Sequence, residues 1–181
     1  ETYLAILDDL GAKRLKIAVH WDLAEPEKGV YHFEDVDWQM QELTQRGGKA
    51  MVAIGMKTPR WPECHIPSWL QGKEEQQAAI LLMLEEVVSR YRNSPALLSW
   101  QVENEPFFPF GECLWEDVAF LKKEVDLVRS LDPLHTIIVS DSGEGSLWIA
   151  AALHGDIVGT TLYRKAWSNS LETYIDYPFS P

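Results

Sequence analysis

The stretch Leu97–Phe110, LLSWQVENEPFFPF, begins as an apolar run typical of a buried β-strand and ends in carboxylates, an amide and prolines. Val102 is the last apolar residue of the run, and Glu103, Asn104 and Glu105 follow it directly. In parallel α/β sheets, ligands bind beyond the carboxyl ends of the strands. This stretch therefore predicts a central strand whose carboxyl end carries polar side chains at a ligand-binding rim.

Four other apolar runs read as strands, and amphipathic helical patterns fill the intervals between all five. The strands are mostly continuous apolar runs, the pattern of strands buried on both faces. The alternation of helix and strand predicts a parallel sheet with right-handed crossovers. The predicted strands are residues 15–19, 49–54, 97–102, 136–140 and 156–162, and the predicted helices fall within residues 1–10, 36–43, 74–91, 114–131 and 147–153.

Two architectures share this alternation, the open doubly wound sheet and the closed (β/α)8 barrel, or TIM barrel. The sequence lacks the Gly-rich phosphate turn that follows an early strand of a dinucleotide-binding sheet. The segments after the predicted strands are long, polar and aromatic, such as GMKTPRWPECHIP, whereas the segments before them are short. This asymmetry favours an α/β barrel with its site at the carboxyl ends of the strands.

The composition is that of a globular protein and argues against some partners. The chain has 181 residues, of which 46% are hydrophobic, enough to bury a core. A formal net charge of -12 argues against nucleic acid as a partner. No apolar stretch reaches the roughly 20 residues that a membrane span requires, so we expect a soluble protein without a membrane partner. Cytoplasmic or secreted location and the oligomeric state both stay open.

The two cysteines, Cys64 and Cys113, are too few for a disulfide framework or a metal site. Both fall in loops that are predicted to leave adjacent strands at the same end of the sheet. The sequence leaves open whether they form one disulfide or remain two free thiols.

The alternation of side chains along the strand that begins at Leu97 places Gln101, Glu103 and Glu105 on one face. Pro106 is expected to hold Glu105 in an extended conformation and to end the strand. A carboxylate fixed there is well placed to act on a ligand, with Glu103 as a neighbouring charge. The alternative is that Glu105 is a loop acid and Asn104 a turn former.

The segments SWQVENEP and LAEPEKGVYHFEDVD resemble the clan A glycoside hydrolases, retaining enzymes of families such as 5, 10, 39 and 42 that share a (β/α)8 barrel. In that clan an Asn-Glu pair ends the fourth strand, where the Glu is the general acid/base and the Asn binds the sugar 2-hydroxyl. The resemblance implies these roles for Glu105 and Asn104.

Counted from that fourth strand, the chain would hold the second to sixth strands of the barrel. We therefore expect one incomplete (β/α)8 catalytic domain over residues 1–181, cut at both ends, with the first, seventh and eighth strands outside it. The clan's nucleophile, a Glu at the end of the seventh strand, would also lie outside. Glu144 follows the fifth strand, and a substrate contact or a plain loop acid is the favoured role for it. The isolated chain is expected to be inactive.

Further substrate-binding candidates lie at the same rim. His20 and Trp21 follow the second strand of the count, where they could bind a hydroxyl and stack on a ring; the alternative is a rim histidine beside an aromatic plug. Tyr163 matches a clan tyrosine that hydrogen-bonds the nucleophile, although Thr161 stands where family 5 often has a histidine. Candidates for lining sugar subsites, each with packing under a loop as the alternative, are Trp61, His65, Phe107, Phe108 and Trp167. The tryptophans on helical stretches, predicted to be structural, are Trp38, Trp69, Trp115 and Trp148.

The resemblance implies a retaining glycosidase that cleaves O-glycosidic bonds of β-linked oligo- or polysaccharides, without a metal or organic cofactor. A carbohydrate-binding pseudoenzyme on the same barrel is one alternative, and a parallel-sheet enzyme of another chemistry is a second. The family within the clan and the sugar and linkage specificity stay open.

Overall fold

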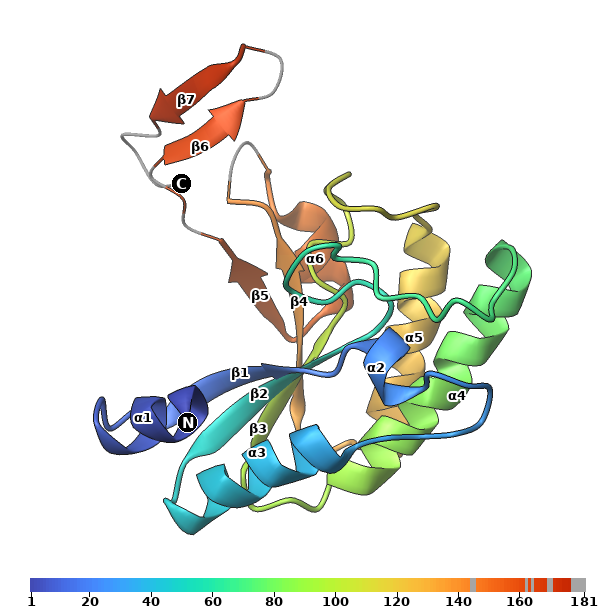
Figure 1. Ribbon diagram of the computed structural model, residues 1–181. Helices are drawn as coiled ribbons and strands as arrows, with labels where there is room; N and C mark the ends of the chain where they lie inside the picture. Colours follow the sequence, from blue (N-terminus) through green and yellow to red (C-terminus); the bar gives the residue numbers. More distant parts are fainter. Residues whose placement is uncertain (144–145, 162, 164, 169–170, 177–181) are drawn as a thin grey trace.

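The computed structural model describes residues 1–143, 146–161, 163, 165–168 and 171–176. Five parallel strands form one sheet in the order β1-β2-β3-β4-β5 (Figure 1). Because neighbours in the sheet are also neighbours in sequence, each crossover leads to the next strand, as it does in a βα barrel. The strands are β1 (Arg14–Ala18), β2 (Lys49–Ile54), β3 (Leu97–Val102), β4 (Thr136–Asp141) and β5 (Ile157–Thr160).

All five predicted strands are present, and the last is shorter than expected because β5 ends at Thr160. The helix predicted from residue 114 begins later: the Asp117 carboxylate accepts a hydrogen bond from the Phe120 N–H at 3.0 Å and so caps a helix that starts at Val118. The sequence did not predict the short helix α2. The helices are α1 (Thr2–Asp8), α2 (Trp21–Ala24), α3 (Glu34–Gln45), α4 (Lys73–Tyr91), α5 (Val118–Leu131) and α6 (Ile149–His154).

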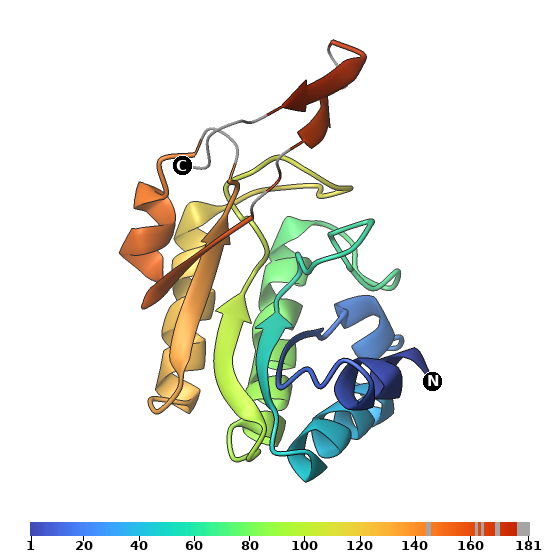
Figure 2. The same ribbon diagram turned by 90° about the vertical axis from the view of Figure 1, so that its left-hand side faces the viewer.

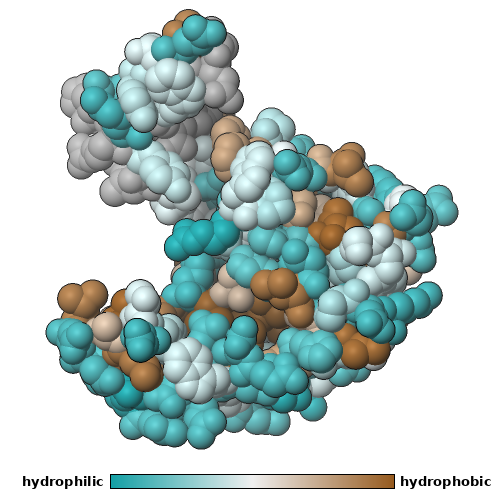
Figure 3. Space-filling model, in the orientation of Figure 1, coloured by the Kyte–Doolittle hydropathy of each residue, from teal (hydrophilic) through white to brown (hydrophobic). Residues whose placement is uncertain are grey.

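One face of the sheet is left open by the helices. Figure 2 looks toward this side, with strands in front and α4 and α5 behind them. The space-filling view has a hollow here, with hydrophobic residues at its floor (Figure 3). Ala18, Ala53, Gln101 and Ile138 lie in register across β1 to β4, and Lys16 on the same face of β1 is exposed. Ala53, Gln101 and Ile138 are nevertheless buried. The prediction that the strands are buried on both faces is therefore wrong for the edge strands β1 and β5, which carry exposed residues.

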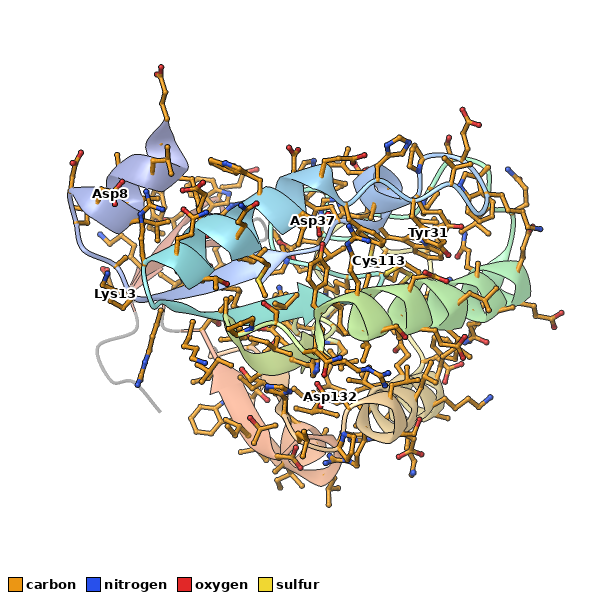
Figure 4. The ribbon with its side chains drawn as sticks, turned by 90° about the horizontal axis from the view of Figure 1, so that it is seen from below. Asp8, Lys13, Tyr31, Asp37, Cys113 and Asp132 are labelled. Atoms are coloured by element: carbon orange, nitrogen blue, oxygen red, sulfur yellow. A yellow bond between two sulfur atoms is a disulfide. The ribbon has the colours of Figure 1, made fainter. Side chains whose placement is uncertain are left out.

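The opposite face packs against the helices and forms the core. Ile17, Val52, Trp100 and Ile137 lie in register across β1 to β4 and are all buried. The indole N–H of Trp100 donates to the Asp132 carboxylate at 2.9 Å, beside the end of α5 (Figure 4). A buried indole with a satisfied N–H contributes apolar area without the cost of an unpaired donor. Because these side chains pack against the helices, the alternate side chains of each strand point to the open face of the sheet.

Two further strands, β6 (Lys165–Ser168) and β7 (Thr173–Asp176), pair antiparallel in a separate hairpin that the sequence did not predict. Trp167 on β6 packs against Tyr174 on β7, with ring centroids 5.1 Å apart in an edge-on arrangement. Such cross-strand aromatic pairs stabilise two-stranded ribbons.

Candidate active site

Polar side chains from neighbouring strands meet at the carboxyl end of the open face. Gln101, the buried last but one residue of β3, is at their centre. Its amide Nε2 donates to the Asn104 side-chain oxygen at 3.2 Å and lies 3.3 Å from the Ser140 hydroxyl oxygen on β4. These contacts tie the segment after β3 to the neighbouring strand. The predicted rim at the carboxyl ends of the strands is therefore present.

Glu105 is held from two other strands. Its carboxylate accepts a hydrogen bond from the Thr161 hydroxyl, just after β5, at 2.9 Å, and its backbone N–H donates to the Ser140 hydroxyl at 2.9 Å. The residue is only 8% exposed. Its φ of 48° is left-handed, so the prediction that Pro106 keeps Glu105 extended is wrong. The strand ends at Val102, and the chain then turns sharply to place this carboxylate.

Glu103 points away from Glu105, toward the helix layer. Its two carboxylate oxygens accept the backbone N–H groups of Met56 and Lys57 at 2.7 and 2.6 Å, and it lines a cavity together with Glu124 on α5. Its φ of 59° breaks the strand alternation, so the prediction that Glu103 and Glu105 share a face is wrong. Burial raises the pKa of Glu103 to about 7.

Asn104, in the segment after β3, is hydrogen-bonded to the segment after β2. Its backbone N–H donates to the Lys57 carbonyl at 2.7 Å, and its side-chain Nδ2 donates to the Glu63 carboxylate at 3.0 Å. A primary amide carries two N–H donors. After the bond to Glu63, the second donor of Asn104 has no acceptor among the described residues.

Lys57 is a site residue that the sequence reasoning missed. Its buried ammonium donates to the backbone carbonyls of Glu105 at 3.0 Å and Phe108 at 2.6 Å. Burial lowers the pKa of Lys57, and nearby carboxylates, Glu63 first, oppose this shift. The only signal in the sequence is a lone lysine shortly after an apolar strand, which does not reveal the distant carbonyls. Lys57 fixes the backbone on both sides of Pro106.

Glu63 and Thr161 were also missed as site residues. Glu63 is an acid in a long loop with nothing to link it to Asn104 in the sequence. Thr161 drew notice only as a departure from a family pattern, and the structure instead places its hydroxyl on the Glu105 carboxylate. That hydroxyl also accepts the Gly143 N–H at 3.0 Å.

The two histidines of the rim lie against each other. The rings of His20 and His65 have centroids 3.9 Å apart. Nδ1 of His20 is 2.9 Å from the Thr58 hydroxyl oxygen, and Nδ1 of His65 is 3.4 Å from the Asp22 carboxylate. Burial lowers the pKa of His20, and the neighbouring His65 lowers it further. This shift favours the neutral imidazole, in which one ring nitrogen donates and the other accepts a hydrogen bond.

Trp21 lies in the core rather than in the site. It is 0% exposed, and its indole N–H donates to the Glu25 carboxylate at 2.8 Å. A fully buried ring has no face to offer a ligand, so the prediction that Trp21 stacks on a sugar is corrected here. Trp21 matches the alternative of an aromatic plug beside a rim histidine.

Three aromatic rings form an exposed cluster on the loops after β2 and β3. Trp61 is 66% exposed and meets Phe110 edge-on at 6.2 Å between centroids, and Phe108 lies 6.2 Å from Phe110. We call Trp61, Phe108 and Phe110 the aromatic cluster. Phe107 is instead partly buried against the core and near His154. Phe110 was not among the predicted candidates.

The two candidates after β5, Tyr163 and Trp167, have no described contact with Glu105. Tyr163 is exposed beyond β5, and Trp167 lies on the hairpin against Tyr174. Neither makes a hydrogen bond to Glu105 among the residues that the structure describes. Glu144 lies outside the described residues.

The tryptophans predicted to be structural pack within the fold. Trp38 packs against Tyr3 at 5.3 Å between centroids. The indole N–H groups of the other three donate to protein oxygens: Trp69 to Glu25, Trp115 to Gln76, and Trp148 to Ser142.

Cys64 and Cys113 form a disulfide, with Cα atoms 5.2 Å apart. The bond resolves the alternative that the sequence left open. It joins the loop after β2 to the loop after β3, the two loops that carry the aromatic cluster. The disulfide therefore joins a residue that precedes Glu105 in the sequence to one that follows it.

The described part of the chain contains no group of three or more His, Cys, Asp or Glu side chains arranged to hold a metal ion. None of its helices is both long and apolar enough to cross a membrane.

The chain has parallel βα units and an Asn-Glu pair, Asn104 and Glu105, after the central strand β3. This combination resembles the clan A glycoside hydrolase barrels. The comparisons confirm this likeness. A probable mannan endo-1,4-beta-mannosidase F of Aspergillus flavus is 34% identical over 73 residues, 40% of this chain and 15% of that protein. Beta-galactosidase Bga of Halorubrum lacusprofundi is 25% identical over 125 residues, 58% of this chain and 18% of that protein.

Solved structures show the same fold. The beta-galactosidase from the Antarctic haloarchaeon Halorubrum lacusprofundi superposes with a TM-score of 0.64 at 16% identity, over 90% of this chain and 37% of that one. A GH5_18 protein from Bifidobacterium longum subsp. infantis superposes with a TM-score of 0.68 at 13% identity, over 90% of this chain and 44% of that one. No family model matches the chain. The chain thus corresponds to less than half of the length of each of these proteins.

Proposed function

We propose that this chain is part of a retaining glycoside hydrolase that cleaves β-linked sugars, with Glu105 as the general acid/base. The observation that carries the proposal is the Glu105 carboxylate itself, nearly buried at the rim, bonded to Thr161 and adjacent to Asn104. The names of the relatives, mannan endo-1,4-beta-mannosidases and beta-galactosidases, support the same reaction class.

Glu105 would protonate the leaving glycosidic oxygen in the first step and deprotonate the incoming water in the second. Retention needs a second carboxyl group about 5 to 5.5 Å away that attacks the anomeric carbon. Glu103 does not suit this role, because it faces the helix layer and holds two backbone N–H groups. Glu63 is bonded to Asn104 on the same side as Glu105. The nucleophile is therefore proposed to come from a strand outside this chain.

Sugar binding is proposed for Asn104, His20 and Tyr163 around the bond that is cleaved. Asn104 has one amide N–H left for the 2-hydroxyl, and His20 can bond a neighbouring hydroxyl. His65 is buried against the Asp22 carboxylate, so its proposed role is to orient His20. The exposed faces of Trp61 in the aromatic cluster and of Trp167 on the hairpin are suited to stacking on pyranose rings.

The test is Glu105→Gln in the complete protein, assayed on aryl β-glycosides with good and poor leaving groups. Glutamine cannot donate the acid proton, so turnover of the poor leaving group should fall about 100-fold or more. Turnover of the activated aryl glycoside should fall far less in its first step, because that leaving group needs no protonation. Glu112→Gln, an exposed acid of the same loop, is the matched control and should change neither rate.

An equal loss of kcat/KM, which reports the first step, on both substrates would contradict the acid role of Glu105. Binding of β-linked oligosaccharides by the complete protein without any turnover would favour the carbohydrate-binding pseudoenzyme instead.

A further inference from the structure

A buried pair of carboxyl groups lies under the rim, on the helix side of the sheet. Glu103, after β3, and Glu124, in the middle of α5, are 5% and 2% exposed, and their carboxyl groups interact with each other. A cavity of about 30 Å³ adjoins both. Two carboxylates in contact in a buried site cannot both be ionised, so this pair shares a proton.

The surroundings decide which partner carries the proton. Both oxygens of Glu103 accept backbone N–H groups, and donors of that kind favour the charged form. Glu124 lacks such donors: its Oε1 atom has no hydrogen-bond partner among the described residues. Burial and the charge of Glu103 raise the pKa of Glu124 well above its usual range. Glu124 is therefore the protonated partner and donates to Glu103.

Other charges face the pair from each neighbouring element. Lys57, on the loop after β2, attracts Glu103 and favours its ionised form. Asp117, at the start of α5, adds negative potential that keeps Glu124 protonated. Glu116 also lines the cavity and carries the same sign of charge. The sum of these charges reinforces a single negative charge on Glu103 and a neutral Glu124.

The pair is connected to Glu105 through the backbone it holds. Glu103 fixes the amides of Met56 and Lys57, and the Lys57 ammonium holds the Glu105 carbonyl. The packing is tight, because a Cβ atom at Gly55 would lie 2.3 Å from the Glu103 carboxylate oxygen. A change in the position of Glu103 is thereby transmitted to the segment that carries Glu105.

We infer that Glu124 is a positioning residue, whose protonated carboxyl group clamps Glu103 onto the backbone of residues 56 and 57 and so holds the rim segment in place. Loss of the proton puts two negative charges in one buried site and releases the two amides. The clamp itself is a property of the fold, and only its effect on turnover rests on the proposed function.

Hydrogen exchange in the complete protein tests the clamp. The probe is the protection factor of a peptide covering residues 55–58, measured by mass spectrometry from about pH 8, where Glu103 with its pKa of about 7 is already ionised, to about pH 10, above the range in which buried glutamates titrate. In the wild type this protection should fall about tenfold or more as pH rises. Glu124→Gln keeps a donor toward Glu103 and carries no charge, so its protection should stay constant. Glu124→Leu removes the donor and should lower protection at every pH.

Glu85→Gln, an exposed glutamate on α4, is the control and should follow the wild type. A wild-type protection factor that does not vary with pH, or a Glu124→Gln variant that loses protection with pH as the wild type does, would overturn the clamp. An alkaline loss of turnover that Glu124→Gln rescues would support the positioning role. Persistence of the exchange effect in a protein with no glycosidase activity would refute the proposed function and leave the clamp intact.

Discussion

Two hydroxyl groups, from Ser140 on β4 and Thr161 after β5, hold Glu105, and each holds a different part of the residue. The Ser140 hydroxyl, on β4, accepts the backbone N–H of Glu105 and fixes where its main chain lies. The Thr161 hydroxyl, after β5, donates to the carboxylate and fixes the orientation of the side chain. A hydrogen bond to a charged group contributes about 1.5 to 3 kcal/mol. Orientation of the acid therefore depends on Thr161 more directly than on any residue of β3.

Thr161→Val should lower kcat/KM of the complete protein about tenfold, because the Glu105 carboxylate loses a hydrogen-bond donor that orients it. Steady-state kinetics on an unactivated β-glycoside measures the effect. The control is Thr160→Val, which removes a hydroxyl that donates to the Thr161 backbone carbonyl and should change kcat/KM less than twofold. A similar loss in both variants would show that the effect comes from β5 as a whole.

At the scale of elements, the turn after β2 and the turn after β3 fit together around Glu103. Gly55 has a φ of 125°, a value that residues with a side chain rarely adopt, and its missing Cβ makes room for the Glu103 carboxylate. Glycine is required here for both conformation and space. The rim is thus specified by a pair of turns rather than by either strand alone.

Gly55→Ala should reduce the free energy of unfolding by about 3 kcal/mol or more, since it adds backbone strain and a steric overlap. Gly47→Ala is the matched control: Gly47 also has a positive φ, of 64°, but a Cβ there meets nothing within 4 Å. We expect about 1 kcal/mol for this control. Urea denaturation measures both, and equal losses would mean that the contact with Glu103 is unimportant.

The sequence predicts elements whose signal is local and misses contacts between distant segments. The apolar runs gave β2 and β3 with the observed bounds, because hydrophobic periodicity reflects burial directly. The left-handed conformation of Glu103 and Glu105 was missed, since tertiary contacts impose it on residues that usually avoid it. Lys57 and Glu124 were missed for a related reason: each gains its role from a partner more than 20 residues away in the chain.

At the scale of the whole molecule, the five-stranded sheet has β1 and β5 at its edges. A closed barrel has no edges, and exposed edge strands present unpaired backbone groups that can pair with another chain. The proposed strand that supplies the second carboxylate would also lie over the open face of the sheet.

The 181-residue chain alone should therefore have no measurable glycosidase activity and should self-associate through its sheet edges. Assays on activated aryl β-glycosides and light scattering at increasing protein concentration measure the two properties. A protein extended to include the proposed remaining strands is the control, and it should be active and less prone to association. Turnover by the 181-residue chain itself would contradict the proposal that the nucleophile lies elsewhere.

The disulfide between Cys64 and Cys113 connects two loops from successive βα units, so that neither loop can move independently of the other. Loops of a barrel are usually free to vary one at a time, which is how one scaffold acquires different specificities. Because the bond joins the two loops, we expect a substitution or insertion in one loop to move the aromatic rings carried by the other. An attempt to change specificity by loop exchange with a relative would have to transplant both loops together, as a single cassette.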